Sequence, residues 1–253
     1  MVAPDSSFSK AVDTEADSSG FDRNFTIENL GFFRFVENLA APIQELTTAI
    51  DREIVSKKAA DPDWDIKRSL IVLPEAFNLG RPYERSDASP SVEAKAMLHA
   101  LRFDIAQHHS VALIVGLLEE KPGRRNSAYW IDAEGETLMC HKVDEDETGL
   151  YRPCRDINPD RLNPILCHNA QVGALICLDA FTECHSCVQQ RRRLLRARLN
   201  HENKIVGVCA QTTLYGPNRH APTDAEGCWY VVADGNYNGE SLVLPPDDRT
   251  RGG

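Results

Sequence analysis

The sequence lacks the features that place a protein in or across a membrane. No stretch of its 253 residues approaches the ~18 uninterrupted apolar residues of a membrane span. Residues 1–20 are rich in Ser, Asp and Ala, and they have neither the basic start nor the apolar centre of a secretory signal. We therefore expect a soluble, cytoplasmic protein without a membrane partner, in which residues 1–20 form a disordered tail.

The sequence also lacks an excess of positive charge. Its formal net charge of −10 works against a nucleic-acid partner, because phosphates require a basic surface. The one basic cluster consists of Arg191, Arg192, Arg193, Arg196 and Arg198. Leu194, Leu195 and Leu199 are spaced among these arginines like the buried side of an amphipathic helix. We expect the arginines to form a solvated helix face, and a nucleic-acid or anion-binding patch is the alternative.

Regularly spaced cysteine pairs are absent too. The eight cysteines occur without a secretion signal, which predicts reduced thiols in a cytosolic setting rather than a disulfide framework, and their intervals are irregular. Only Cys184 and Cys187 have the interval of a metal or redox pair, and His201 or Cys209 would have to complete the ligand set. One such pair is a weak signal. We therefore expect neither a metal nor a cofactor, with zinc or redox use as the alternative.

No internal repeat and no linker rich in Pro, Gly or Ser divides the chain, so we expect one domain over residues 21–253. Hydrophobic periodicity predicts helices at 37–57, 91–107 and 188–200. Strands are predicted at 69–73, 112–118, 127–131, 137–141, 172–176, 205–210, 229–233 and 241–244, with a poorly marked first strand near 24–29.

The strand patterns indicate an α/β protein. Short continuous apolar runs such as Leu70-Ile71-Val72-Leu73 are expected where both faces of a sheet are covered. The hairpin signal Asp132-Ala133-Glu134-Gly135 joins two predicted strands, which makes the sheet mixed rather than purely parallel.

Three chemically reactive residues each follow a predicted strand. Glu75 follows strand 69–73, Lys142 follows strand 137–141 and Cys177 follows strand 172–176. Reactive groups gather past the carboxyl ends of strands in α/β proteins, and a carboxylate, an ammonium and a thiol suffice for covalent catalysis. Each residue alone has an ordinary interpretation: a solvated acid, a surface charge and a small buried hydrophobe. Their coincidence points to a catalytic site.

The blocks around these residues resemble a known family. Leu73-Pro74-Glu75-Ala76-Phe77, His141-Lys142 and Gly173-Ala174-Leu175-Ile176-Cys177-Leu178-Asp179 are similar to the three signature blocks of the nitrilase superfamily, the carbon–nitrogen hydrolases. Arg125-Asn126-Ser127-Ala128 resembles that family's approach to the lysine block, and Ala233-Asp234-Gly235-Asn236 resembles one of its later strands. The resemblance covers roughly residues 24–246.

The resemblance implies a fold and a chemistry. The fold is an α-β-β-α sandwich of mixed sheets covered by helices, commonly assembled as a homodimer or larger homo-oligomer. Cys177 is then the nucleophile, Glu75 the proton-transfer group, and Lys142 with the backbone N–H of Leu178 the stabiliser of the negative oxygen. No metal or cofactor is required, and the partner is a small amide-type substrate.

A second carboxylate is often found downstream of the lysine in this family. Asp144-Glu145-Asp146-Glu147 offers several candidates, all closer to Lys142 than is usual, and Glu147 is the favoured one. Four neighbouring acids are also typical of a solvated loop, which is the alternative.

The match departs from the family in two respects. Leu178 stands where many amidases have Tyr, while Asp179 resembles the amidase and carbamoylase branches more than the nitrilases. The chain is short between 210 and 229 and stops soon after Pro246, so we expect a sandwich shortened at its C-terminus. The leading hypothesis is hydrolysis of an amide or carbamoyl bond. A nitrilase and a catalytically inactive binding or assembly module are the alternatives.

Overall fold

The computed structural model describes residues 26–28, 40–78, 92–120, 125–143, 162–181, 186–210, 227–235, 241–244 and 246. Within these residues the strands form two five-stranded mixed sheets. The first sheet has the order β1-β2-β3-β4-β5 and consists of β1 (Thr26–Glu28), β2 (Ser69–Val72), β3 (Ala112–Glu119), β4 (Arg125–Ile131) and β5 (Glu136–His141). Strands β1 to β3 are parallel, and β4 and β5 continue the sheet antiparallel.

The second sheet has the order β6-β7-β8-β9-β10. It consists of β6 (Ile165–Cys167), β7 (Ala170–Ile176), β8 (Lys204–Ala210), β9 (Trp229–Asp234) and β10 (Leu242–Leu244). Strands β7 to β9 are parallel, while β6 and β10 pair antiparallel at the two edges. The mixed character predicted from the hairpin is confirmed in both sheets.

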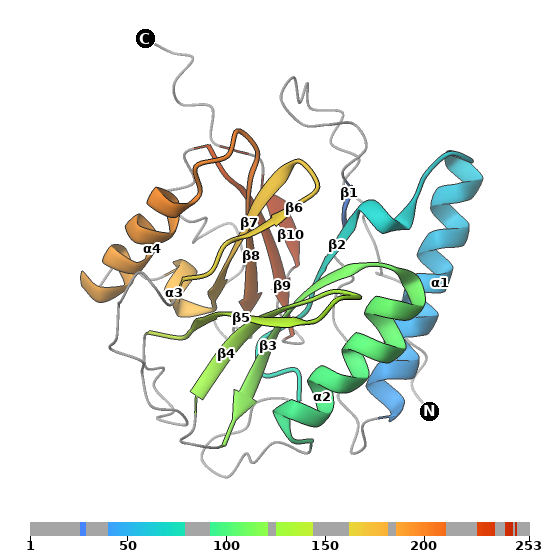
Figure 1. Cartoon of the computed structure of the whole chain (residues 1–253), viewed down its shortest axis with the longest axis horizontal. Helices are drawn as coiled ribbons and strands as arrows, with labels where there is room; N and C mark the ends of the chain where they lie inside the picture. The colour runs from blue at the N-terminus through green and yellow to red at the C-terminus, as the bar shows by residue number, and fades with distance from the viewer. Residues whose placement is uncertain are drawn as a thin grey trace.

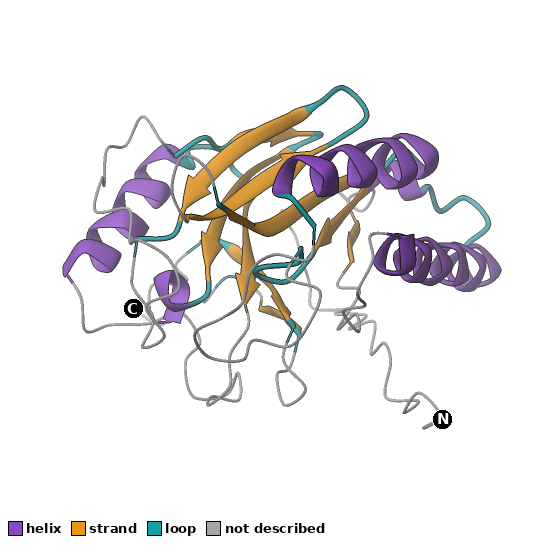
Figure 2. Cartoon of the chain, turned by 90° about the horizontal axis from the view of Figure 1, so that it is seen from below, coloured by secondary structure: helices purple, strands orange, loops and turns teal. Residues whose placement is uncertain are grey.

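Helices cover the outer face of each sheet (Figures 1 and 2). α1 (Ala40–Ala60) and α2 (Ala94–Ala100), which continues as the π-helical segment η2 (Leu101–Gln107), lie against the first sheet. α3 (Leu178–Phe181) and α4 (Ser186–Arg198) lie against the second. A short 3₁₀ turn, η1 (Ile66–Arg68), leads into β2. The expected α-β-β-α sandwich is confirmed.

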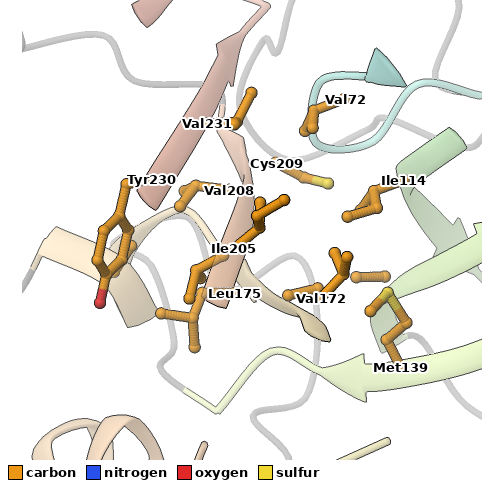
Figure 3. Close-up of a cluster of buried hydrophobic side chains, with 14 of the residues drawn as sticks. Val72, Ile114, Met139, Val172, Leu175, Ile205, Val208, Cys209, Tyr230 and Val231 are labelled. Atoms are coloured by element: carbon orange, nitrogen blue, oxygen red, sulfur yellow. The ribbon is translucent and has the colours of Figure 1, made fainter. Parts of the chain in front are cut away.

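Alternation along β2 shows why its sequence is apolar throughout. Leu70 and Val72 belong to the core between the two sheets, whereas Ile71 and Leu73 belong to the core beneath the helices. A strand buried on both faces needs apolar side chains at every position. Figure 3 shows the core between the sheets, whose members include Val72, Ile114 and Met139 from the first sheet and Val172, Val208 and Cys209 from the second.

The predicted helices and strands are present, with bounds that shift by a few residues, but the short elements β6 and α3 were missed. Three residues of β6 give too short a pattern to mark a strand, and its turn into β7 places His168 at φ 50°, which no glycine signals. α3 has only four residues.

The predicted solvated arginine face of α4 is wrong for two of its residues. Arg191 is 1% exposed and Arg192 is 2% exposed, although Leu195 and Leu199 are buried as expected. Arg192 Nη1 donates to the carbonyl oxygen of Ala180 at 3.2 Å. Carbonyls at the end of a helix lack intrahelical partners, so α3 supplies an acceptor that makes a buried guanidinium tolerable.

None of the described helices combines the length and apolar character needed to cross a membrane.

A buried histidine behind α1 predicts a pH dependence of stability. Burial, together with neighbouring His108, lowers the pKa of His109 from its ordinary value of 6.5, and Asp51 at 3.8 Å only partly opposes this. The unfolded chain therefore binds a proton more readily than the folded chain, so the free energy of unfolding should fall as the pH drops below 6.5. Urea unfolding at several pH values measures this slope, which His109→Gln should flatten. His99→Gln, at an exposed position in α2, should leave the slope unchanged.

Candidate functional site

The acid, the ammonium and the thiol predicted from the sequence all lie in the described and buried part of the molecule. Glu75 follows β2 and is 2% exposed, Lys142 follows β5 and is 2% exposed, and Cys177 follows β7 and is 5% exposed. The first two therefore come from one sheet and the thiol from the other. Such burial is unusual for Glu and Lys unless the charges are paired.

A buried ion pair joins Glu75 and Lys142. Lys142 Nζ donates to Glu75 Oε1 at 2.7 Å. The same oxygen accepts a second bond from Asn126 Nδ2 at 2.5 Å. Two charges removed from water are tolerated only when they are paired and hydrogen-bonded, and here one carboxylate oxygen receives two N–H donors.

The order of strands explains how these groups meet. Glu75 and Lys142 follow β2 and β5, which are separated by β3 and β4. Asn126 lies on β4 and accepts the backbone N–H of Lys142 on its own carbonyl at 2.8 Å. Its side chain then reaches Glu75 in the other direction, so Asn126 bridges the acid and the lysine.

Cys177 occupies a sharp left-handed turn. Its φ is 44°, a conformation that costs free energy for a residue with a side chain. The turn joins the end of β7 to the start of α3, and the carbonyl of Cys177 accepts the N–H of Ala180 at 2.8 Å. Strain of this kind concentrates at functional sites. Sequence reasoning did not find it, because positive φ is normally signalled by Gly or Asn.

The backbone N–H of Leu178 belongs to the first turn of α3. The N–H groups of a first helical turn have no acceptor within their own helix, so they can bind an external negative oxygen. The oxyanion role of this group stays a prediction.

A buried carboxylate connects the turn that carries Cys177 to the segment that carries Lys142. Asp179, two residues after Cys177, accepts the backbone N–H of Val143 on Oδ2 at 2.9 Å. Val143 directly follows Lys142, and both Asp179 and Val143 are buried. The sequence marked Asp179 only as a feature of a family branch, while the structure places it between the two halves of the candidate site.

The end of β8 holds the other two segments in place. The carbonyl of Cys209 accepts the N–H of Cys177 at 2.8 Å, and the carbonyl of Ala210 accepts the N–H of Glu75 at 3.4 Å. Consecutive carbonyls of one strand thus fix the backbone of the thiol and that of the acid. This relation depends on how the two sheets pack, which no local sequence pattern reveals.

Two candidate features fall outside the described residues. Glu147, the favoured second carboxylate, is one, and Cys184 of the candidate metal pair is the other. Among the residues that are described, no three His, Cys, Asp or Glu side chains gather in a metal-binding group.

The family model described as carbon-nitrogen hydrolase matches residues 39–187, which is more than half of the chain and includes Glu75, Lys142 and Cys177. The chain belongs to the carbon–nitrogen hydrolase family. The superfamily resemblance of its sequence blocks is thereby confirmed. No curated protein sequence matches the chain.

Solved structures with the same fold include an amidase from Nesterenkonia sp. The crystal structure of that amidase has a TM-score of 0.62 and 20% identity, over 88% of this hydrolase and 83% of the amidase chain. A double mutant of the amidase from Nesterenkonia sp. AN1 in complex with acrylamide has a TM-score of 0.62 and 19% identity, over 89% and 85% of the two chains. At this level of identity the similarity shows a shared fold.

A glycine on β3 makes room for the candidate acid. A Cβ at Gly116 of this hydrolase would lie 2.8 Å from the Cα of Glu75 and 3.0 Å from the Cβ of Cys209. Both neighbours are close to the backbone and cannot swing away. Gly116→Ala should therefore lower the free energy of unfolding by about 1–3 kcal/mol, as overpacking does.

Urea unfolding measures this effect, and Gly135→Ala is the matched control because nothing lies within 4 Å of a Cβ there. Equal stability of the two variants would contradict the close packing of Glu75 against β3.

Proposed function

We propose that this carbon–nitrogen hydrolase cleaves an amide or carbamoyl bond through a thioester on Cys177, with Glu75 and Lys142 as the other members of a catalytic triad. The observation that carries the proposal is the buried Glu75–Lys142 ion pair at 2.7 Å, which shares a bonded framework with the strained turn of Cys177. Each of these features is costly in a purely structural setting.

The first step is acylation. Glu75 takes the proton of the Cys177 thiol, and the sulfur attacks the carbonyl carbon to form a C–S bond and a negative tetrahedral oxygen. Lys142 and the N–H of Leu178 stabilise that oxygen, and one preorganised donor of this kind contributes about 2.7–4 kcal/mol to catalysis. Glu75 then gives its proton to the departing amine as the C–N bond breaks, which leaves the thioester.

The second step is deacylation. Glu75 removes a proton from water, the resulting hydroxide attacks the thioester carbonyl, and the C–S bond breaks. Glu75 returns the proton to the sulfur, so a carboxylic acid is released and the thiol is regenerated.

The ion pair gives Lys142 a defined electrostatic function in both steps. When Glu75 accepts a proton it becomes neutral, and the buried ammonium loses its counter-charge. The developing oxyanion then replaces that counter-charge, so the net charge of the buried site stays constant while the negative charge moves from carboxylate to substrate. Because charges interact strongly away from water, this exchange favours the tetrahedral state.

Amides are the preferred substrate class. Asp179 stands where the amidase and carbamoylase branches carry Asp, and the related Nesterenkonia amidase has been crystallised with acrylamide and butyramide and with an acetamide moiety added at its active-site cysteine. Those ligands belong to that amidase, and they make short aliphatic amides the first compounds to test.

We further propose Glu147 as the carboxylate that orients substrate or water, one domain over 21–253, a homodimer or larger assembly, and a cytoplasmic location.

Removal of the nucleophile tests the reaction directly. Cys177→Ala should abolish the release of ammonia from short amides, because no thioester can form, while the thermal unfolding midpoint stays close to that of the wild type. The matched control is Cys167→Ala on β6, a cysteine whose thiol pKa is raised to about 11 by burial and which should be dispensable. Ammonia is measured with a coupled assay, with the corresponding nitriles offered in parallel. Turnover that survives Cys177→Ala would refute the mechanism, and turnover of nitriles alone would favour the nitrilase alternative.

The reactivity of the thiols tests whether the site is poised for catalysis. Near pH 7.5, iodoacetamide should modify Cys177 faster than the other seven cysteines, because the ammonium and the base of the proposed triad would favour its thiolate. Burial instead raises the pKa of Cys209 and Cys228, so these thiols should react slowly.

Peptide mass spectrometry resolves the rates, and Lys142→Met should remove the advantage of Cys177. Equal rates at all cysteines would favour the inactive binding or assembly module.

A further inference from the structure

We propose that Asn126 is a positioning residue for Glu75: together with Lys142 it occupies carboxylate oxygen Oε1, so that protons enter and leave Glu75 through Oε2. This inference rests on the proposed function, because it assigns different roles to the two oxygens of the carboxylate in the proposed triad. Oε1 accepts N–H donors, and Oε2 carries the proton.

Two N–H donors share one oxygen of the Glu75 carboxylate. A carboxylate oxygen has about two lone-pair sites, and Oε1 receives Lys142 Nζ at 2.7 Å and Asn126 Nδ2 at 2.5 Å. With both sites used by N–H groups, Oε1 has no lone pair left for a proton. The proton from the thiol therefore goes to Oε2.

The negative charge of Glu75 fixes the orientation of the Asn126 side-chain amide. An amide nitrogen donates to a carboxylate, whereas an amide oxygen placed at 2.5 Å from it would be repelled. The side chain consequently turns its Oδ1 the other way, into a buried position where it has no hydrogen-bond partner among the described residues. A buried acceptor without a partner costs stability. An apolar side chain of similar size would avoid this cost, so the benefit of the amide must lie in its contact with Glu75.

A second buried asparagine shows what a structural amide looks like in this protein. Asn78 donates to the carbonyls of Val92 and Leu118, and its Oδ1 accepts the N–H of Leu118. These three bonds connect backbone segments. In contrast, the side-chain bond recorded for Asn126 goes to the candidate catalytic acid.

The location of Asn126 supports the same role. It lies on β4, between β3 and the lysine strand β5, and its backbone carbonyl holds the N–H of Lys142 at 2.8 Å. One residue therefore fixes the start of the lysine segment through its main chain and the acid through its side chain. Motion of either charged group against the other would break one of these two bonds.

The test follows the titration of Glu75. An N–H donor favours the ionised carboxylate, so loss of this donor in Asn126→Leu should make Glu75 harder to ionise. This is measured by ¹³C NMR of the labelled Glu carboxyls in the full chain, with Glu75→Gln used to assign the signal. Since the reaction begins with ionised Glu75, the acidic side of the pH profile of kcat/KM should move to higher pH, and kcat should fall about tenfold or more.

A second variant keeps the test informative if Asn126→Leu does not fold. Asn126→Asp keeps the shape of the side chain but places a second carboxyl beside Glu75, and two neighbouring carboxyls cannot both ionise freely. A proton should then be held by the pair at a pH clearly above the wild-type titration. The control is Asn203→Leu, next to the amino end of β8, which removes a side-chain hydrogen bond to the carbonyl oxygen of Asn169. This variant should change neither the NMR signal of Glu75 nor the pH profile of kcat/KM.

Each outcome decides the proposal. A Glu75 titration that is unchanged in both Asn126 variants, while Lys142→Met shifts it, would overturn the positioning role. An unfolding midpoint that falls in Asn126→Leu with an unchanged titration would also overturn it and assign Asn126 to structure alone. The NMR measurement needs no turnover. A wild type that hydrolyses no amide would therefore refute the proposed function separately.

Discussion

The buried pairing of a carboxylate and an ammonium is the constraint on which the candidate site depends. Each charge alone would lose its hydration on burial at a cost of several kcal/mol, so neither Glu75 nor Lys142 can be buried without the other. The strands that precede them, β2 and β5, are separated by β3 and β4 in the sheet, and each of these two strands contributes a residue that accommodates the ion pair. β3 contributes Gly116, which leaves space beside the backbone of the acid, and β4 contributes Asn126, which adds a donor.

Hydrogen bonds to the backbone connect the turn that carries Cys177 with the segments that carry the pair. Successive carbonyls at the end of β8 accept the N–H groups of Cys177 and Glu75, while Asp179 accepts the N–H of Val143 beside the lysine. These bonds cross between segments that are far apart in sequence. The sandwich arrangement is therefore required to assemble the site, because either sheet alone would carry only part of the chemistry.

The sequence predicted much of this arrangement because some of its signals are local. Apolar runs mark the strands, and the reactive residues that follow them could be read without knowing the fold. What the sequence did not show depends on neighbours from elsewhere in the chain. Asn126 acquires its contact only through the register of β3, β4 and β5, and Arg192, which is buried like Arg191, has its acceptor because α3 lies beside α4. Helical periodicity describes one helix at a time, so it assigned those arginines to solvent.

Features that lower stability gather around the candidate site, and this favours the proposed enzyme over an inactive scaffold. Over most of the described core, side chains alternate between two apolar layers and local preference agrees with the fold. Around Glu75 the pattern changes: a charged pair is buried, a cysteine adopts a left-handed turn, and the side-chain oxygen of Asn126 has no hydrogen-bond partner in the part of the chain that the structure describes. A binding or assembly module built on this sandwich would gain nothing from these three features, since apolar residues in relaxed conformations would pack the same space more stably. Covalent catalysis does gain, because it requires a base, a cation and a nucleophilic sulfur held in fixed relation in a site that excludes water.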